Sequence, residues 1–300
     1  MINKKQLLLS FLLITFLFNI DIIITSVINS SYLFFYNIFV TIFPFIILSD
    51  ILIYYDYHIF ISNTIGKFFS KLFNIDSNST IVFIMSILTS QPSNSIYLNN
   101  LLNKKLISEN TANRLLTYTY FPSIAFVLGT IGIKLYNSVN IGIMLLLTNY
   151  LCNICIGIYL RKYKCEESVF IINKNNNTFF SMLKESIIKS INTCFIILGN
   201  IILFSIIINI INNYIYINPI VNSIFTGLFE ITNGINIISN LNISLNYKLM
   251  ITSFILNFSG LSIIFQSKSI LSEYNINIKK ILIIKLVFSF IFSILLICTC

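Results

Sequence analysis

Long apolar stretches dominate this chain and constrain what it can fold into. An α-helix of about 20 residues crosses the roughly 30 Å hydrocarbon core of a bilayer. Stretches of that length occur at 7–28, 32–55, 115–136, 138–160, 190–213, 249–271 and 280–298. The pattern predicts an all-α polytopic membrane protein.

The composition also favours a lipid environment. Apolar residues make up 56% of the 300 residues and charged residues 10%, against about 25% charged in an average soluble domain. So few charges cannot cover a soluble protein, whose exterior would become one apolar patch. The bilayer is therefore the expected partner. Cytosolic enzymes, disordered chains and nucleic-acid-binding domains are excluded, despite the net charge of +9.

Two further apolar segments are interrupted by polar residues. Residues 79–102 break at Thr89 to Ser95, and residues 220–241 break at Glu230 to Gly234. Each break falls where a spanning helix would be most deeply buried, and lipid cannot satisfy the backbone N–H and C=O groups of such a break. We therefore predict two re-entrant hairpins, sheltered by protein, whose polar tips lie near each other at the bilayer midplane.

The positions of the basic residues support this topology. With a cytoplasmic N-terminus and both hairpins returning to their side of entry, all but Lys134 and Lys248 of the 19 Lys and Arg residues lie on the cytoplasmic side. Lys268 and Lys285 are included as charges at helix ends. Cytoplasmic segments of membrane proteins carry an excess of Lys and Arg, so the positive-inside rule favours re-entrant hairpins over full spans.

The two halves of the chain share the same order of elements. Each has a spanning helix, a broken polar segment, and a helix interrupted by small or kinking residues at 121–123 or 257–260. Phe45-Ile46-Ile47-Leu48 also recurs as Phe195-Ile196-Ile197-Leu198. Inverted repeats with broken helices at equivalent positions are typical of transporters that bind substrate at the midplane.

These patterns divide the chain into four regions. We predict an N-terminal transmembrane helix at 1–30, a first repeat at 31–160, a cytoplasmic linker and amphipathic segment at 161–189, and a second repeat at 190–300. The basic amphipathic stretch 66–73 should lie in the membrane interface. Residues 103–114 should form a short interfacial helix with Ser108 as its N-cap.

Motifs in both halves resemble the YlbJ-type sporulation integral membrane proteins. They are Thr41-Ile42-Phe43-Pro44-Phe45 to Ser49, the loop Leu101 to Ser108, Gly227 to Gly234, and Asn257 to Ser262. The resemblance covers roughly residues 35–285. That family carries the nucleoside-recognition gate domain, which is distantly similar to concentrative nucleoside transporters, spore maturation proteins and the membrane part of ferrous iron transporters.

The resemblance implies a fold of paired hairpins and broken helices, with two gate repeats. It also implies a role in endospore formation, moving dipicolinic acid across the outer forespore membrane. The family often has glycines at the first hairpin break, where this chain has Ser90-Gln91-Pro92-Ser93-Asn94. Asn tolerates the left-handed conformation that Gly usually supplies, so the turn can still form.

Polar residues at the breaks are the candidate ligands for a small polar anion. Half-helix N-termini carry partial positive charge and favour an anion. Glu230 could line a pathway or act as a structural helix cap, and the other polar groups could equally satisfy backbone freed by the breaks. The candidates are Ser90, Gln91, Ser93, Asn94, Ser123, Glu230, Thr232, Asn233, Asn257, Ser259 and Ser262.

The sequence shows no pattern expected of an enzyme. It has no nucleophile–base–acid set, no metal-ligand spacing and no phosphate loop, and its single histidine is His58. Cys152 and Cys155 form a lone CxxC whose spacing places both on one helix side. Asp50 is expected to make a helix–helix hydrogen bond. We expect neither cofactor nor metal, while a coupling cation or proton and the oligomeric state stay open.

The sequence therefore predicts a multi-pass transporter or facilitator that takes up a small polar anion between the hairpin tips. Two alternatives remain: a non-transporting sporulation scaffold and a nucleoside transporter. The nucleoside alternative is less favoured, because Pro92 and Ser93 follow Gln91 where those transporters have a glutamate.

Overall fold

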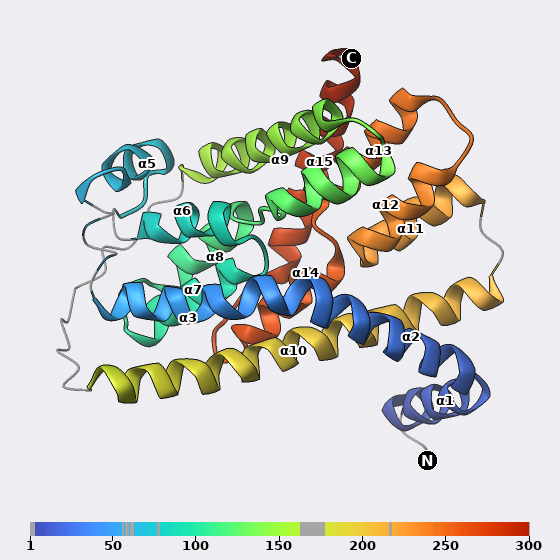
Figure 1. Cartoon of the computed structure of the whole chain (residues 1–300), viewed down its shortest axis with the longest axis horizontal. Helices are drawn as coiled ribbons and strands as arrows, with labels where there is room; N and C mark the ends of the chain where they lie inside the picture. Colours follow the sequence, from blue (N-terminus) through green and yellow to red (C-terminus); the bar gives the residue numbers. More distant parts are fainter. Residues whose placement is uncertain are drawn as a thin grey trace.

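The computed structural model describes residues 4–55, 57, 60, 63–76, 79–162, 178–215 and 218–299. Throughout these residues the regular structure is helical and contains no strand (Figure 1). The all-α prediction is confirmed. His58 and most of the predicted linker, at 163–177, lie outside the described residues.

Four described helical stretches are long and apolar enough to cross a membrane. They are α9 (Val139–Leu160), α10 (Phe179–Tyr214), α13 with α14 (Leu245–Phe258 and Leu261–Ile270), and α15 (Ile278–Thr299). Each contains or overlaps a predicted span. The predicted linker and amphipathic segment at 161–189 stays a prediction. Its last residues belong to α10, which begins at Phe179 and is capped by Thr178, whose side chain accepts a hydrogen bond from the Ser181 amide.

The N-terminal region differs from the prediction of one span at 7–28. The elements are α1 (Lys4–Phe18), α2 (Ile20–Leu33), the π-helix η1 (Phe34–Phe39) and α3 (Val40–Tyr54). The chain breaks at Asn19, whose side-chain amide donates to the carbonyl of Thr15 (2.7 Å). Asn competes with backbone hydrogen bonding in this way. The helix that follows the break then continues through η1 and α3 to Tyr54.

The two interrupted segments form helix pairs. The first pair is α6 (Thr80–Thr89) with α7 (Ser93–Asn103), and the second is α11 (Pro219–Phe229) with α12 (Ile231–Asn240). An arm of 10 or 11 residues is about 15 Å long, which is half of a roughly 30 Å hydrocarbon core. The pairs lie toward opposite ends of the molecule in Figure 1, the first near α5 (Gly66–Phe73). Re-entry into a bilayer stays a prediction that these lengths favour.

A broken helix follows each pair. In the first half, α8 (Glu109–Tyr118) is separated from the π-helix η3 (Phe126–Leu135) by a break centred on residues 119–123. In the second half, Ser259 (φ 72°) and Gly260 (φ 66°) separate α13 from α14. The order of pair, broken helix and long helix therefore occurs twice. We refer to these two interruptions as the first and second breaks.

The start of α8 corrects the prediction of an interfacial helix at 103–114. Ser108 does cap the helix, by accepting from the Thr111 amide (3.2 Å), but most of α8 is buried. Arg114 is only 6% exposed, and its guanidinium donates to the carbonyl of Phe73 (2.8 Å) at the end of α5. Basic side chains stabilise helix C-termini in this way. Arg114 therefore fastens α5 to α8.

Candidate functional site

The first hairpin tip is hydrogen-bonded to the first break. The Gln91 amide donates to the carbonyl of Phe121 (2.8 Å), and the Asn94 side chain donates to the Thr119 hydroxyl (3.2 Å). The positive φ at this turn belongs to Ser90 (66°), whereas Asn94, the residue expected to replace a glycine there, lies in α7. The predicted polar residues of this tip thus lie against backbone that has left its helix.

The second tip is organised by Glu230. Its carboxylate accepts hydrogen bonds from the backbone amides of Thr232 (3.0 Å) and Asn233 (2.7 Å). Glu230 is therefore the N-cap of α12, the structural alternative considered from sequence. This tip lies against the second break, since a Cβ on Gly260 would be 3.3 Å from the carbonyl oxygen of Phe229. A pathway role for Glu230 stays a prediction.

Two asparagines on α9 connect the two breaks. Asn153 donates to the carbonyl of Tyr120 (3.0 Å) in the first break and to the side-chain oxygen of Asn149 (3.1 Å). Asn149 donates to the side chain of Asn257 (3.2 Å) at the end of α13. All three asparagines are at most 2% exposed. Asn149 and Asn153 were not among the predicted site residues, although their spacing of four places both on one side of a helix.

Lys285 on α15 lies beside the first break. The prediction that it is a charge at a helix end is wrong, because its side chain is 0% exposed. Its ammonium lies 4.7 Å from the centroid of the Tyr120 ring. Among the described residues it has no hydrogen-bond partner, and no carboxylate there forms an ion pair with it. Buried ionisable residues within membrane segments are rare and usually functional.

We define the central polar cluster as Gln91, Asn94, Tyr120, Asn149, Asn153, Asn257 and Lys285. Several polar atoms in and beside it are buried without a partner in the described part of the chain. These atoms are Gln91 Oε1, Ser93 Oγ, Asn94 Oδ1, Asn153 Oδ1, Ser259 Oγ and Lys285 Nζ. An unsatisfied buried polar group costs about 1–3 kcal/mol, so such groups call for a functional explanation.

The remaining predicted site residues have local structural contacts. The Ser123 hydroxyl accepts from the Phe126 amide (3.1 Å) after the first break. The Ser262 hydroxyl accepts from the side chain of Gln266 (3.1 Å) within α14. Thr232 and Asn233 are half-buried at the second tip. The structure therefore brings Gln91, Asn94 and Asn257 into one cluster, whereas Ser123 and Ser262 bond only to residues three or four positions away.

The two hairpins are separated by α14, which packs against both α7 and α11. Figure 1 also places α14 centrally, between the two pairs. Each tip thus contacts a broken helix. The predicted closeness of the two tips at the bilayer midplane would therefore be indirect, with α13 and α14 lying between them.

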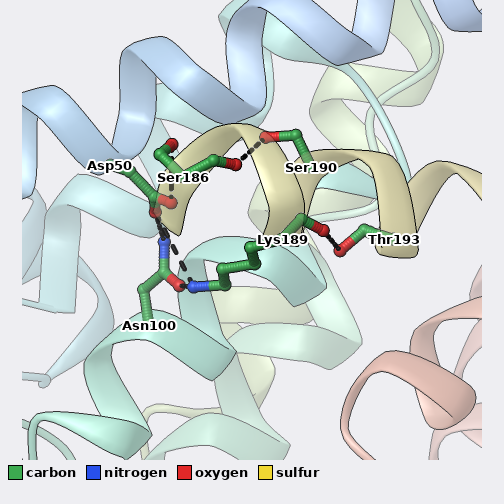
Figure 2. A network of polar contacts seen from close by, with 6 residues as sticks. All are labelled: Asp50, Asn100, Ser186, Lys189, Ser190 and Thr193. Atoms are coloured by element: carbon green, nitrogen blue, oxygen red, sulfur yellow. Dashed lines mark hydrogen bonds and ion pairs between the residues drawn. The ribbon is translucent and has the colours of Figure 1, made fainter. Parts of the chain in front are cut away.

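A second polar network surrounds Asp50 (Figure 2). Its carboxylate accepts from the side chain of Asn100 on α7 (2.5 Å) and from the hydroxyl of Ser186 on α10 (3.0 Å). Lys189 lies 3.7 Å from the same carboxylate and also donates to Asn100. The predicted helix–helix hydrogen bond of Asp50 is confirmed. The network fastens the second arm of the first hairpin to α3 and α10.

The chemistry of the central polar cluster suits an anionic or polar ligand better than a metal ion. Its only formal charge is the Lys285 ammonium and none of its members is a carboxylate, so the cluster would repel a metal cation and attract an anion. Across the described residues, no three His, Cys, Asp or Glu side chains gather in a way that could hold a metal ion. Cys152 and Cys155 are free thiols.

Comparison with known proteins agrees with the resemblance derived from the motifs. The chain is 27% identical over 289 aligned residues to the sporulation integral membrane protein YlbJ of Bacillus subtilis (strain 168). The match covers 83% of this chain and 70% of the relative. No family model matches, and no solved structure matches. With the four apolar helices, this likeness identifies a multi-pass integral membrane protein similar to the YlbJ-type family.

Proposed function

We propose that the protein is a membrane transporter or facilitator for a small polar anion, and not an enzyme. The observation that supports this proposal is the central polar cluster, which joins two helix breaks inside an apolar helical bundle. Broken helices at the midplane are where secondary transporters bind their substrates. The only charged member of the cluster is Lys285, so the cluster favours an anion over a cation.

Dipicolinic acid is the anion that the YlbJ-type resemblance suggests. It is a small dicarboxylate, and its role in endospore formation agrees with the description of the relative as a sporulation protein. The outer forespore membrane is then the expected location, with a cytoplasmic N-terminus. The direction of transport and any coupling to a cation or proton are not part of the proposal.

The two halves suggest how access could alternate. One unit would carry a hairpin and its broken helix, and movement of that unit against α2, α3 and α10 would open the cluster to one side at a time. The Asp50 network connects the first hairpin to α3 and α10. If the first hairpin moves, these hydrogen bonds would therefore have to break, or α3 and α10 would have to move with the hairpin.

Uptake by proteoliposomes tests the proposal. Purified protein is reconstituted, and labelled dipicolinate and labelled uridine are supplied with and without a sodium gradient. We expect dipicolinate flux that unlabelled dipicolinate inhibits, with no comparable flux of uridine. Uridine flux alone would favour the nucleoside transporter. Flux no greater than in protein-free vesicles for both compounds would overturn the proposal and favour the scaffold.

A further inference from the structure

A polar cleft opens where α8 and α15 begin. It has a volume of about 770 Å³, within the range of small-molecule sites. Its charged lining residues are Arg114, Lys279 and Lys280, and all three are cationic. An anion approaching this end of the protein would therefore be attracted into the cleft.

The two helices that line the cleft are held in register at this end. The backbone amide of Asn277, just before α15, donates to the side chain of Asn113 on α8 (2.8 Å). Asn113 in turn donates to the carbonyl of Asn275 (2.9 Å). Because these contacts tie both helix starts together, α8 and α15 run side by side from the cleft into the bundle.

The cleft leads toward Lys285. Of the residues that line the cleft, Thr117 is the one farthest along α8 from its start, and Ile281 is the one farthest along α15. Lys285 is four residues beyond Ile281, which is one helical turn or about 6 Å deeper. Tyr120 follows Thr117 in the same direction, and its ring contacts the Lys285 ammonium. The cation therefore lies one turn below the cleft, at the first break.

A carboxylate would supply what Lys285 lacks. An ammonium offers three donors, and none of the three has a protein acceptor among the described residues. Charge-assisted hydrogen bonds to a carboxylate are about twice as strong as neutral ones. Asn149 and Asn153 already donate their side-chain N–H groups to the protein, so Lys285 supplies the donors that a carboxylate would need.

We propose that Lys285 binds a carboxylate group of the transported anion, and that the anion reaches it through the cleft between α8 and α15. This inference rests on the proposed function and assigns its binding group and its route of entry. The ligand class is a small carboxylate. A neutral molecule of the same shape would not bind well, because it could not pair with the buried ammonium.

Equilibrium binding to the detergent-solubilised full chain tests the assignment. The probes are pyridine-2,6-dicarboxylate and its neutral diamide, which share a ring and differ in charge. We expect the wild type to bind the dicarboxylate at least 100-fold more tightly than the diamide. Lys285→Met, which keeps an unbranched side chain but removes the ammonium, should weaken dicarboxylate binding at least 100-fold, and Lys285→Arg should lose less than Lys285→Met.

Lys162→Met is the matched control. The Lys162 ammonium also lies over a tyrosine ring, 4.4 Å from the centroid of Tyr159, but the residue is exposed. We expect wild-type binding in this variant. Replacing both Lys279 and Lys280 by Gln should slow association of the dicarboxylate about tenfold and reduce its salt dependence, because these residues steer the anion into the cleft.

The outcomes separate the two proposals. Dicarboxylate transport by the wild type together with unchanged affinity in Lys285→Met would overturn the assignment of Lys285 and leave the transport function standing. Equal affinity of the wild type for the dicarboxylate and the diamide would also overturn the assignment of Lys285. This comparison needs no variant, so it remains decisive even if Lys285→Met does not fold. Absence of carboxylate transport and binding in the wild type would instead refute the proposed function.

Discussion

Replacing Gly234 by Ala should force apart the arms of the second hairpin. Gly227 on α11 lies three residues before Glu230, and Gly234 on α12 lies four residues after it. The two glycines face each other across the hairpin. A Cβ on Gly234 would be 2.2 Å from the Cα of Gly227 and 2.9 Å from the Ser223 carbonyl oxygen. Both atoms belong to backbone, so no side chain can rotate away.

The size of the effect follows from these distances. Ordinary contacts of a Cβ begin at 3.4 Å, so the arms would have to separate by about 1.2 Å, the difference from the 2.2 Å approach. Overpacking of a close-packed interior typically costs about 1–3 kcal/mol, and occasionally more. Because backbone must move, we expect about 3 kcal/mol, which corresponds to a fall in Tm on the order of 5 °C.

Thermal unfolding in detergent, followed with a fluorogenic thiol reagent, measures this change. Cys152 and Cys194 are buried and react when the bundle opens, while the exposed Cys298 gives a constant baseline. Gly199→Ala is the control, since a Cβ on Gly199 meets nothing within 4 Å. It should be neutral or stabilising by up to about 1 kcal/mol, because Ala is the better helix former. A wild-type Tm for Gly234→Ala would refute the close packing of the two arms.

Further variants test the contacts that hold the site in place. Asp50→Ala should destabilise the protein by about 2 kcal/mol, because the donors of Asn100 and Ser186 lose their acceptor; an unchanged Tm would show that the network is dispensable. Arg114→Met should release α5, seen as faster hydrogen exchange of its amides, whereas the exposed Arg161→Met should not. Glu230→Ala should cost about 1 kcal/mol through loss of the cap, with faster exchange at the first amides of α12, and Glu230→Gln should lose less.

Much of the architecture could be predicted from the sequence. The spans at 138–160, 249–271 and 280–298 correspond closely to α9, α13 with α14, and α15, because each is a long apolar run between polar segments. The interruptions at 89–95 and 230–234 were also located correctly, since a cluster of polar residues inside an apolar run leaves few alternatives to a break. Asp50 was predicted to bond between helices because it is a charged residue in an otherwise apolar span.

Other features could not be read from local sequence. Asn19 interrupts an apolar run as a single residue, and its effect on the backbone depends on a side-chain bond to Thr15. Lys285 follows four apolar residues and was assigned to a helix end, because only the packing of α15 shows that its ammonium meets Tyr120. Asn149 and Asn153 had no distinguishing motif in an Asn-rich chain.

Local composition determined that this chain lies in a membrane. It also determined the positions of the helices and of the two interrupted segments, because hydrophobicity acts on each stretch independently of its neighbours. Tertiary structure decided which polar residues meet. The cluster around Lys285 draws on the first hairpin tip, the first break, α9, α13 and α15. Contacts between residues more than 100 positions apart, such as Asn149 with Asn257, depend on how those segments pack.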